Sequence, residues 1–144
     1  MGDVEEAADY ARNHAGSKSK GQCAKYVADA LMYGGGFSFT RQKSAYMYHT
    51  NGILLDLGFD EISRGSPEKG DVYVEDKTYT HPHGHIAIYD GYNWVSDFVQ
   101  KTDRVHSYDQ GINYYYRYKQ VSSDSENNES NSSSSDQGNN YYGW

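Results

Sequence analysis

The chemistry that this 144-residue chain could perform centres on its single cysteine, Cys23. It follows Gly21 and Gln22 and lies one or two residues inside a predicted helix. Unpaired N–H groups and the macrodipole at a helix N-terminus favour an anion, so we expect a lowered thiol pKa. The same N–H groups could stabilise an oxyanion during acyl transfer. The alternative is a structural cysteine that packs on one apolar stripe with Val27 and Leu31.

A nucleophilic cysteine needs a base, usually a histidine, and a group that orients this base. Among the six histidines, His85 is the only one that begins a clear strand. If the loop of the following hairpin is residues 90–92, His85 lies directly opposite Asp97, and Trp94 shares a face with Ile88. Directly opposed side chains have Cβ atoms about 5 Å apart, and a carboxylate there would fix the imidazole tautomer. A four-residue loop would instead turn Asp97 to the other face.

The elements that must position these residues change from helices to strands along the chain. We expect a helix capped by Asp3, a second from Gln22 to the glycine run at 34–36, and a third within 42–55, interrupted at 51–52. Alternating apolar residues predict an antiparallel meander of strands at 59–62, 71–75, 85–89, 94–99 and 114–121. This order predicts an α+β fold, with N-terminal helices packed on an antiparallel β-sheet.

Composition changes sharply after Val121. Residues 122–144 contain eight serines and five asparagines but no lysine or arginine. Such a segment cannot bury enough apolar surface to offset the entropy of ordering it. We therefore expect a catalytic domain at residues 1–121 and a disordered, acidic tail at residues 122–144.

Charge and composition exclude several functional classes. The chain carries 20 acidic against 13 basic residues, a net charge of −7, whereas a nucleic-acid-binding surface needs concentrated basic residues. No apolar run approaches the roughly 20 residues of a membrane helix. One cysteine cannot form an internal disulfide, and the acidic N-terminus has no apolar segment typical of a secretory signal. We expect a monomer that binds neither nucleic acid nor membrane.

Three short motifs occur in order within residues 16–98. Gly21-Gln22-Cys23, followed by Lys25-Tyr26-Val27, resembles the nucleophile motif of CHAP-domain peptidoglycan hydrolases. Gly70-Asp71-Val72 resembles the strand start that precedes the histidine of this family. Gly84-His85-Ile86-Ala87-Ile88 resembles the family's histidine motif. Asp97 occupies the place of the family's third member, an acid or an amide.

This resemblance implies a papain-like fold related to the NlpC-type cysteine peptidases, and hydrolysis of an amide bond in bacterial peptidoglycan. The bond could be muramoyl–L-alanine, within the stem peptide, or in a cross-bridge. The implied catalytic residues are Cys23, His85 and Asp97. Gln22 would be a second oxyanion donor, and we expect substrate contacts from Tyr26, His83 and Tyr92. The resemblance implies neither a cofactor nor a metal.

The expected site of action is the periplasm or cell wall of a target bacterium. Without a visible secretory signal, the protein would reach it by another route. Small single-domain amidases without such signals occur as type VI secretion effectors and as phage lysins, and both fit this chain. An effector would have a cognate immunity protein, which we expect to plug the cleft.

Three other interpretations use the same residues differently. A metal site could form from alternate residues of one strand, His81, His83 and His85. A cell-wall-binding module without catalysis could use the fourteen tyrosines that precede the tail to stack on sugars or peptides. A papain-like protease or acyltransferase that acts on a protein substrate would need the same cysteine and histidine.

Overall fold

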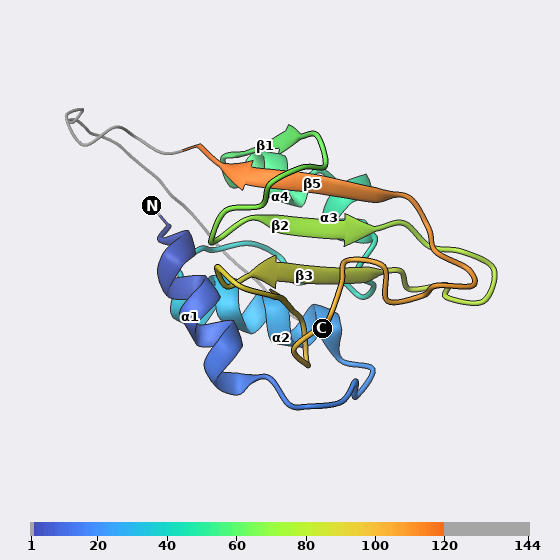
Figure 1. Ribbon diagram of the computed structural model, residues 1–144. Coiled ribbons are helices and arrows are strands. Elements are labelled where there is room, and N and C mark those ends of the chain that lie inside the picture. The colour runs from blue at the N-terminus through green and yellow to red at the C-terminus, as the bar shows by residue number, and fades with distance from the viewer. Residues whose placement is uncertain (1, 120–144) are drawn as a thin grey trace.

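The computed structural model describes residues 2–119, which form an α+β fold. The predicted tail at residues 122–144 lies outside the described residues, and so does the end of the predicted domain. Five antiparallel strands form one sheet in the order β1-β5-β2-β3-β4, and helices pack on one of its faces (Figure 1). None of the helices in residues 2–119 combines the length and the hydropathy that a membrane span requires.

The first helix, α1 (Val4–His14), forms where the sequence predicts it. Asp3 caps it, because its carboxylate accepts hydrogen bonds from the N–H groups of Glu5 (3.0 Å) and Glu6 (3.1 Å). The buried side of α1 consists of small residues, namely Val4, Ala7, Ala8 and Ala11. Their size allows the helix to approach its neighbours closely.

The second helix begins at the cysteine. It spans α2 (Cys23–Asp29), continues into the π-helix η1 (Ala30–Gly34), and stops at the predicted glycine run. The predicted third helix is present as two short ones, α3 (Met47–Thr50) and α4 (Ile53–Asp56). They are separated at the predicted interruption, where Gly52 adopts a left-handed φ of 68°.

The strands are β1 (Phe59–Ile62), β2 (Val72–Glu75), β3 (His85–Tyr89), β4 (Trp94–Val95) and β5 (Asn113–Tyr118). The predicted meander is wrong in its order, because β5 lies between β1 and β2. Tyr115 and Tyr116 are neighbours on β5, so they point to opposite faces, and both are buried. Because β5 lies in the interior of the sheet, neighbouring residues cover both of these side chains.

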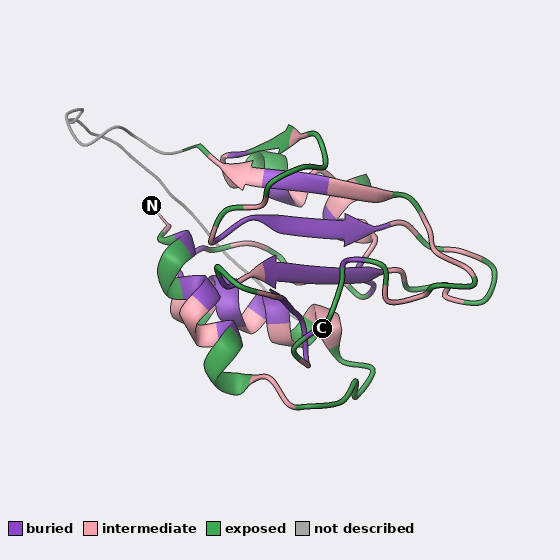
Figure 2. Cartoon of the chain, viewed as in Figure 1, coloured by how far each residue is buried: buried purple, intermediate pink, exposed green. Residues whose placement is uncertain are grey.

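The two faces of the sheet carry separate apolar clusters. One cluster joins α1 and α2 to the helix-facing residues of the sheet, Val72, Val74, Ile86 and Ile88. The other lies on the opposite face and contains Tyr73, Ala87, Trp94 and Tyr115. Figure 2 shows that β2 and β3 are buried along almost their whole length. The strand that carries the histidine is therefore held from both sides.

The hairpin after β3 has a four-residue loop, so the predicted three-residue loop is wrong. Tyr89 pairs with Trp94. Asp90 closes this longer turn, because its Oδ1 accepts hydrogen bonds from the N–H groups of Tyr92 (2.7 Å) and Asn93 (2.6 Å).

This one-residue difference in register exchanges the faces of the returning strand. Trp94 lies on the face of Ala87, not with Ile88 as predicted. Beyond β4 the chain also leaves the regular sheet, and Phe98 forms a bridge with Gly16 near the start of the molecule. The predicted strand at 94–99 is thus reduced to two residues.

Candidate active site

Cys23 is the first residue of α2 and lines a cleft of about 390 Å³. The walls of this cleft come from residues 21–25 on one side and from residues 43–45 and His83 on the other. Gly21 adopts a φ of 69°, a left-handed conformation that lets the chain turn sharply into the helix. Because α2 packs on β3, the cysteine is carried to the strand that begins with His85.

The Cys23 thiol is protonated in the resting site. Burial is the largest influence on it and raises its pKa to about 11. A backbone hydrogen bond from Ile86 lowers the pKa, while the charge of Asp97 raises it. The predicted lowering of the thiol pKa is therefore wrong, because desolvation of the thiolate outweighs the helix N-terminus. The contact with Ile86 also places the sulfur beside the residue that follows His85.

Asp97 supports the loop before Cys23 and not the histidine. Its Oδ2 accepts hydrogen bonds from the backbone N–H groups of Lys20 (2.6 Å) and Gln22 (3.0 Å), and its side chain is fully buried. The predicted role of Asp97 as the partner of His85 is wrong, because the longer hairpin loop turns it away from that ring. Asp97 instead determines where the turn into α2 lies.

Gln100 makes the hydrogen bond that was predicted for Asp97, since its Oε1 lies 2.8 Å from Nε2 of His85. The amide nitrogen of Gln100 donates to the Tyr73 hydroxyl (3.0 Å) and to the Thr102 carbonyl (2.9 Å). A carbonyl can only accept, so this contact determines which end of the amide faces the ring. Gln100 Oε1 must accept from Nε2–H, and in the neutral ring Nδ1 is then unprotonated.

The His85 ring favours its neutral form. Burial is the largest influence on the ring and lowers its pKa below the ordinary 6.5. The hydrogen bond with Gln100 raises the pKa in part, and the nearby His106 lowers it. Among residues 2–119, no hydrogen-bond partner is found for Nδ1. This nitrogen is therefore available to accept a proton.

Gly84 has a steric reason to precede the histidine. Its φ is 68°, and a Cβ at this position would lie 2.2 Å from the carbonyl oxygen of Glu75 on β2. A side chain would push the start of β3 away from β2 and displace His85. The glycine of the Gly-His motif is thus required by the close approach of the two strands.

Glu75 is a fully buried carboxylate on the base side of the site. It pairs across the sheet with His85. Its Oε2 accepts the N–H of Gly111 (2.8 Å), and its Oε1 lies 2.9 Å from Nδ1 of His106. The His106 ring meets the His85 ring edge-on, with centroids 5.7 Å apart. Glu75 therefore anchors the loop that packs beside the base.

The three histidines of the metal-site alternative have different surroundings. His83 Nδ1 lies 2.7 Å from Ser44 Oγ, and the His81 ring stacks on His106 with centroids 3.5 Å apart. His85 makes the contact with Gln100 described above. Within the described part of the chain, no group of three or more His, Cys, Asp or Glu side chains could hold a metal ion. The metal-site alternative is therefore not supported.

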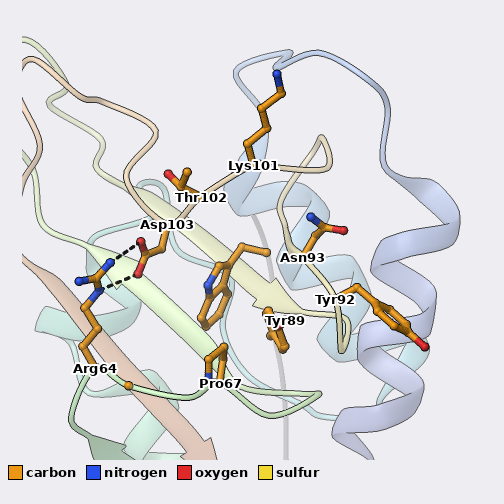
Figure 3. Close-up of a pocket in the computed structure, with 10 residues that line it drawn as sticks. Arg64, Pro67, Tyr89, Tyr92, Asn93, Lys101, Thr102 and Asp103 are labelled. Carbon is orange, nitrogen blue, oxygen red and sulfur yellow. Dashed lines mark hydrogen bonds and ion pairs between the residues drawn. The ribbon is translucent and has the colours of Figure 1, made fainter.

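Two of the predicted binding residues line the cleft and two do not. Gln22 lines the cleft beside Cys23, and His83 lines the opposite wall. Tyr26 lies on α2 outside the lining, and its hydroxyl is 3.3 Å from Lys20 Nζ. Tyr92 is 82% exposed and lines a separate cavity of about 580 Å³. Figure 3 shows its ring pointing away from Arg64 and Asp103 on the far side of that cavity.

Gln100 is the main site residue that the sequence did not reveal. It follows a predicted strand and belongs to no motif, so no local signal marks it. Lys43 was missed as well, because it lies at the start of a weak helical pattern and reaches the cleft only through tertiary packing. Counting a four-residue hairpin loop would have excluded Asp97 as the partner of His85, but it would not have identified Gln100.

Comparisons with solved structures give two strong matches. The crystal structure of the type VI native effector–immunity complex Tae3–Tai3 from Ralstonia pickettii contains a chain 40% identical to this one. The match covers 81% of this chain and 98% of that chain, with a TM-score of 0.67. The selenomethionine form of the same complex matches at 40% identity, 78% and 99% coverage, and a TM-score of 0.69. No family model and no curated protein matches the chain.

Proposed function

The chain belongs to the family of the type VI effector Tae3, and on this premise we propose that it is an antibacterial amidase. It cleaves an amide bond of bacterial peptidoglycan, with Cys23 as nucleophile and His85 as base. We assign it a papain-like fold of the CHAP and NlpC type, since a cysteine at a helix start packs on a strand that begins with histidine. The motifs that resemble the CHAP hydrolases lie at these two residues.

One observation carries the proposal. Gln100 holds His85 by Nε2, and the Thr102 carbonyl determines the orientation of the Gln100 amide. Nδ1 is thereby left as the basic nitrogen of a buried ring, on the strand against which the helix of the half-buried Cys23 packs. A structural cysteine and a structural histidine would not need this arrangement. A third side chain that orients the base is the usual partner in nucleophilic catalysis.

In the proposed reaction, Nδ1 of His85 takes the proton of the Cys23 thiol while the sulfur attacks the amide carbonyl carbon. The tetrahedral intermediate collapses, the C–N bond breaks, and His85 passes the proton to the leaving amine. His85 next removes a proton from water, whose oxygen attacks the thioester. The C–S bond breaks, the acid product leaves, and the thiol regains its proton from His85.

Two donors could stabilise the oxyanion of this intermediate. The backbone N–H of Cys23 belongs to the first turn of α2, where N–H groups have no partner within the helix. The side chain of Gln22 lines the cleft beside it and makes no hydrogen bond with residues 2–119. We assign Gln22 as the second donor, because its side-chain amide can donate and no other group of residues 2–119 occupies it.

The relatives also suggest where the protein acts and what inhibits it. The matched structures are complexes of an effector with an immunity protein. We infer that this chain is delivered by a type VI system to the periplasm of a target cell. A cognate immunity protein would cover the Cys23 cleft. Co-purification of an adjacent gene product with the tagged protein, and inhibition of hydrolysis by it, would test this part of the proposal.

The main experiment compares the wild-type protein with Cys23→Ser on purified sacculi. The serine variant keeps the size and the helix position of the residue but removes the thiol. We expect soluble fragments from the wild type and none from the variant. Mass spectrometry of the fragments would identify the cleaved bond from its new amine and carboxyl ends.

Other outcomes of this experiment point to the other interpretations. Equal fragments from both proteins would contradict cysteine catalysis. Binding to sacculi without cleavage by either protein would favour a cell-wall-binding module. If sacculi stay intact but the wild type cleaves a protein substrate and Cys23→Ser does not, the result would favour the protease.

A further inference from the structure

Lys43 presents an uncompensated positive charge in the Cys23 cleft. Two lysines line this cleft, Lys25 and Lys43. Lys25 Nζ lies 3.0 Å from a carboxylate oxygen of Asp29. Lys43 is exposed, and within residues 2–119 it makes no ion pair or hydrogen bond through its side chain. Its ammonium group is therefore free to meet a charge that arrives with a ligand.

The rest of the cleft favours an anionic ligand too. Among the described residues that line it, none is acidic. The charge of Asp97 acts on the thiol, but its carboxylate is buried outside the cleft lining and accepts backbone N–H groups of the loop. The whole chain carries 20 acidic against 13 basic residues. The cleft differs from this acidic balance, because the only Asp, Glu, Lys or Arg side chains in its described lining are two lysines.

The backbone on both sides of Lys43 is held in place. The preceding residue, Gln42, donates its N–H to the Tyr48 hydroxyl (3.2 Å). The following residue, Ser44, is buried, and its Oγ lies 2.7 Å from His83 Nδ1. The lysine is thus carried on a fixed segment of the wall that faces α2. A charge on a fixed segment can distinguish between ligands at a lower cost in ordering than a charge on a mobile loop.

We propose that Lys43 binds a carboxylate of the substrate and makes the cleft selective for an acidic peptide over its amidated form. The inference rests on the proposed function, in which the substrate is a peptidoglycan stem peptide, a chain that carries carboxylates near its amide bonds. Lys43 is a specificity residue in this proposal and takes no part in the proton transfers. Replacement of the substrate carboxylate by a carboxamide would remove the charge but preserve the shape.

The test uses two soluble stem peptides that differ only in having a free carboxylate or a carboxamide. Calorimetry would measure their binding to the full chain carrying Cys23→Ser, so that no hydrolysis interferes. We expect about fivefold tighter binding of the carboxylate form, the range of a partly exposed ion pair. Adding Lys43→Gln should bring the ratio to about one, while Lys43→Arg should retain it because the charge remains.

Lys101→Gln is the matched control, because Lys101 is an exposed lysine that lines the separate cavity and not the cleft. A binding ratio that survives Lys43→Gln, or that Lys101→Gln abolishes equally, would overturn the assignment of Lys43. Equal binding of the two peptides by the Cys23→Ser protein would overturn it as well. Failure of the proposed function would be seen separately, as sacculi that the wild-type protein leaves intact.

Discussion

The proposed nucleophile side of the site (residues 16–23, α2 and Asp97) and the proposed base side (β2, β3 and residues 98–111) use their polar groups differently. On the nucleophile side a carboxylate, Asp97, accepts two backbone N–H groups and so holds the loop that leads into Cys23. On the base side a neutral amide, Gln100, holds the ring of His85 directly. The carboxylate of that side, Glu75, holds the neighbouring loop through Gly111 and not the ring itself.

This difference shows how two buried acids can support a site in which Cys23 and His85 stay neutral. A carboxylate in contact with the imidazole would favour the imidazolium, whereas the amide of Gln100 orients the ring without adding a charge. Burial then lowers the pKa of His85 and raises that of Cys23. Both groups favour their neutral forms, so in the proposed mechanism the proton moves during the reaction itself. Asp97 and Glu75 bind backbone N–H groups. Their charges also raise the pKa of His85, and the charge of Asp97 raises that of Cys23, but neither carboxylate makes a hydrogen bond with either group.

The largest loss of activity is expected from Gln100→Ala on the base side. The substitution leaves Nε2–H of His85 without its acceptor and frees the ring to rotate. We expect kcat/KM on a soluble peptidoglycan fragment to fall about 100-fold, as for the loss of a group that orients a general base. Gln110→Ala is the control, because its amide bonds Asn113 and the backbone of His106 but not His85. Retention of wild-type activity by Gln100→Ala would remove Gln100 from the site.

A smaller effect is expected from Asp97→Ala on the nucleophile side. The backbone N–H groups of Lys20 and Gln22 would lose their acceptor, at a cost of about 1–3 kcal/mol in the free energy of unfolding. Activity should fall about tenfold, because a misplaced loop weakens the alignment of Cys23. Urea unfolding and the hydrolysis rate would measure the two effects.

Asp97→Asn keeps an acceptor oxygen and should behave more mildly than Asp97→Ala. In both variants the pKa of His85 should fall slightly, because the charge of Asp97 raises it without a hydrogen bond, and NMR can follow this titration. A His85 titration that moves markedly in both variants would show that Asp97 acts on the base after all.

The smallest effect on kcat/KM at neutral pH is expected from Gln100→Glu, which replaces the neutral amide beside the His85 ring with a carboxylate. In the wild type, burial lowers the pKa of His85, so the base stays deprotonated as the pH falls through 6.5. The acid limb of kcat/KM should therefore lie below pH 6.5. In Gln100→Glu, the carboxylate should raise the pKa and move this limb upward by about one pH unit. An unchanged limb would mean that His85 does not determine it.

Local signals in the sequence were sufficient for most of the elements. Asp3 capped α1 as expected, and the glycine run ended the helix that begins at Cys23. Four of the five predicted strands formed close to their predicted positions. Alternation of apolar residues with a period of two indicates a strand that has a buried face. Gly84 and His85 were recognised from one short motif. These features depend on neighbours within a few residues, which a sequence displays directly.

The partner of the base could not be found in this way. Asp90 lengthened the hairpin loop by one residue, and that single step sent Asp97 to the nucleophile loop. Gln100 reaches His85 only because the chain turns back after β4 and its N–H bonds the Trp94 carbonyl (2.9 Å). A side-chain hydrogen bond in a loop thus decided which of two polar residues meets the ring.

The sequence by itself determined the helix that presents Cys23, the strand that presents His85, and the glycine that lets this strand begin. The tertiary structure alone decided that Gln100 orients the ring, that Lys43 enters the cleft, and that the thiol is protonated at rest. The physical reason is the range of the interactions. Helix capping and strand alternation act within a few residues, whereas burial and side-chain hydrogen bonds depend on which distant segments pack together.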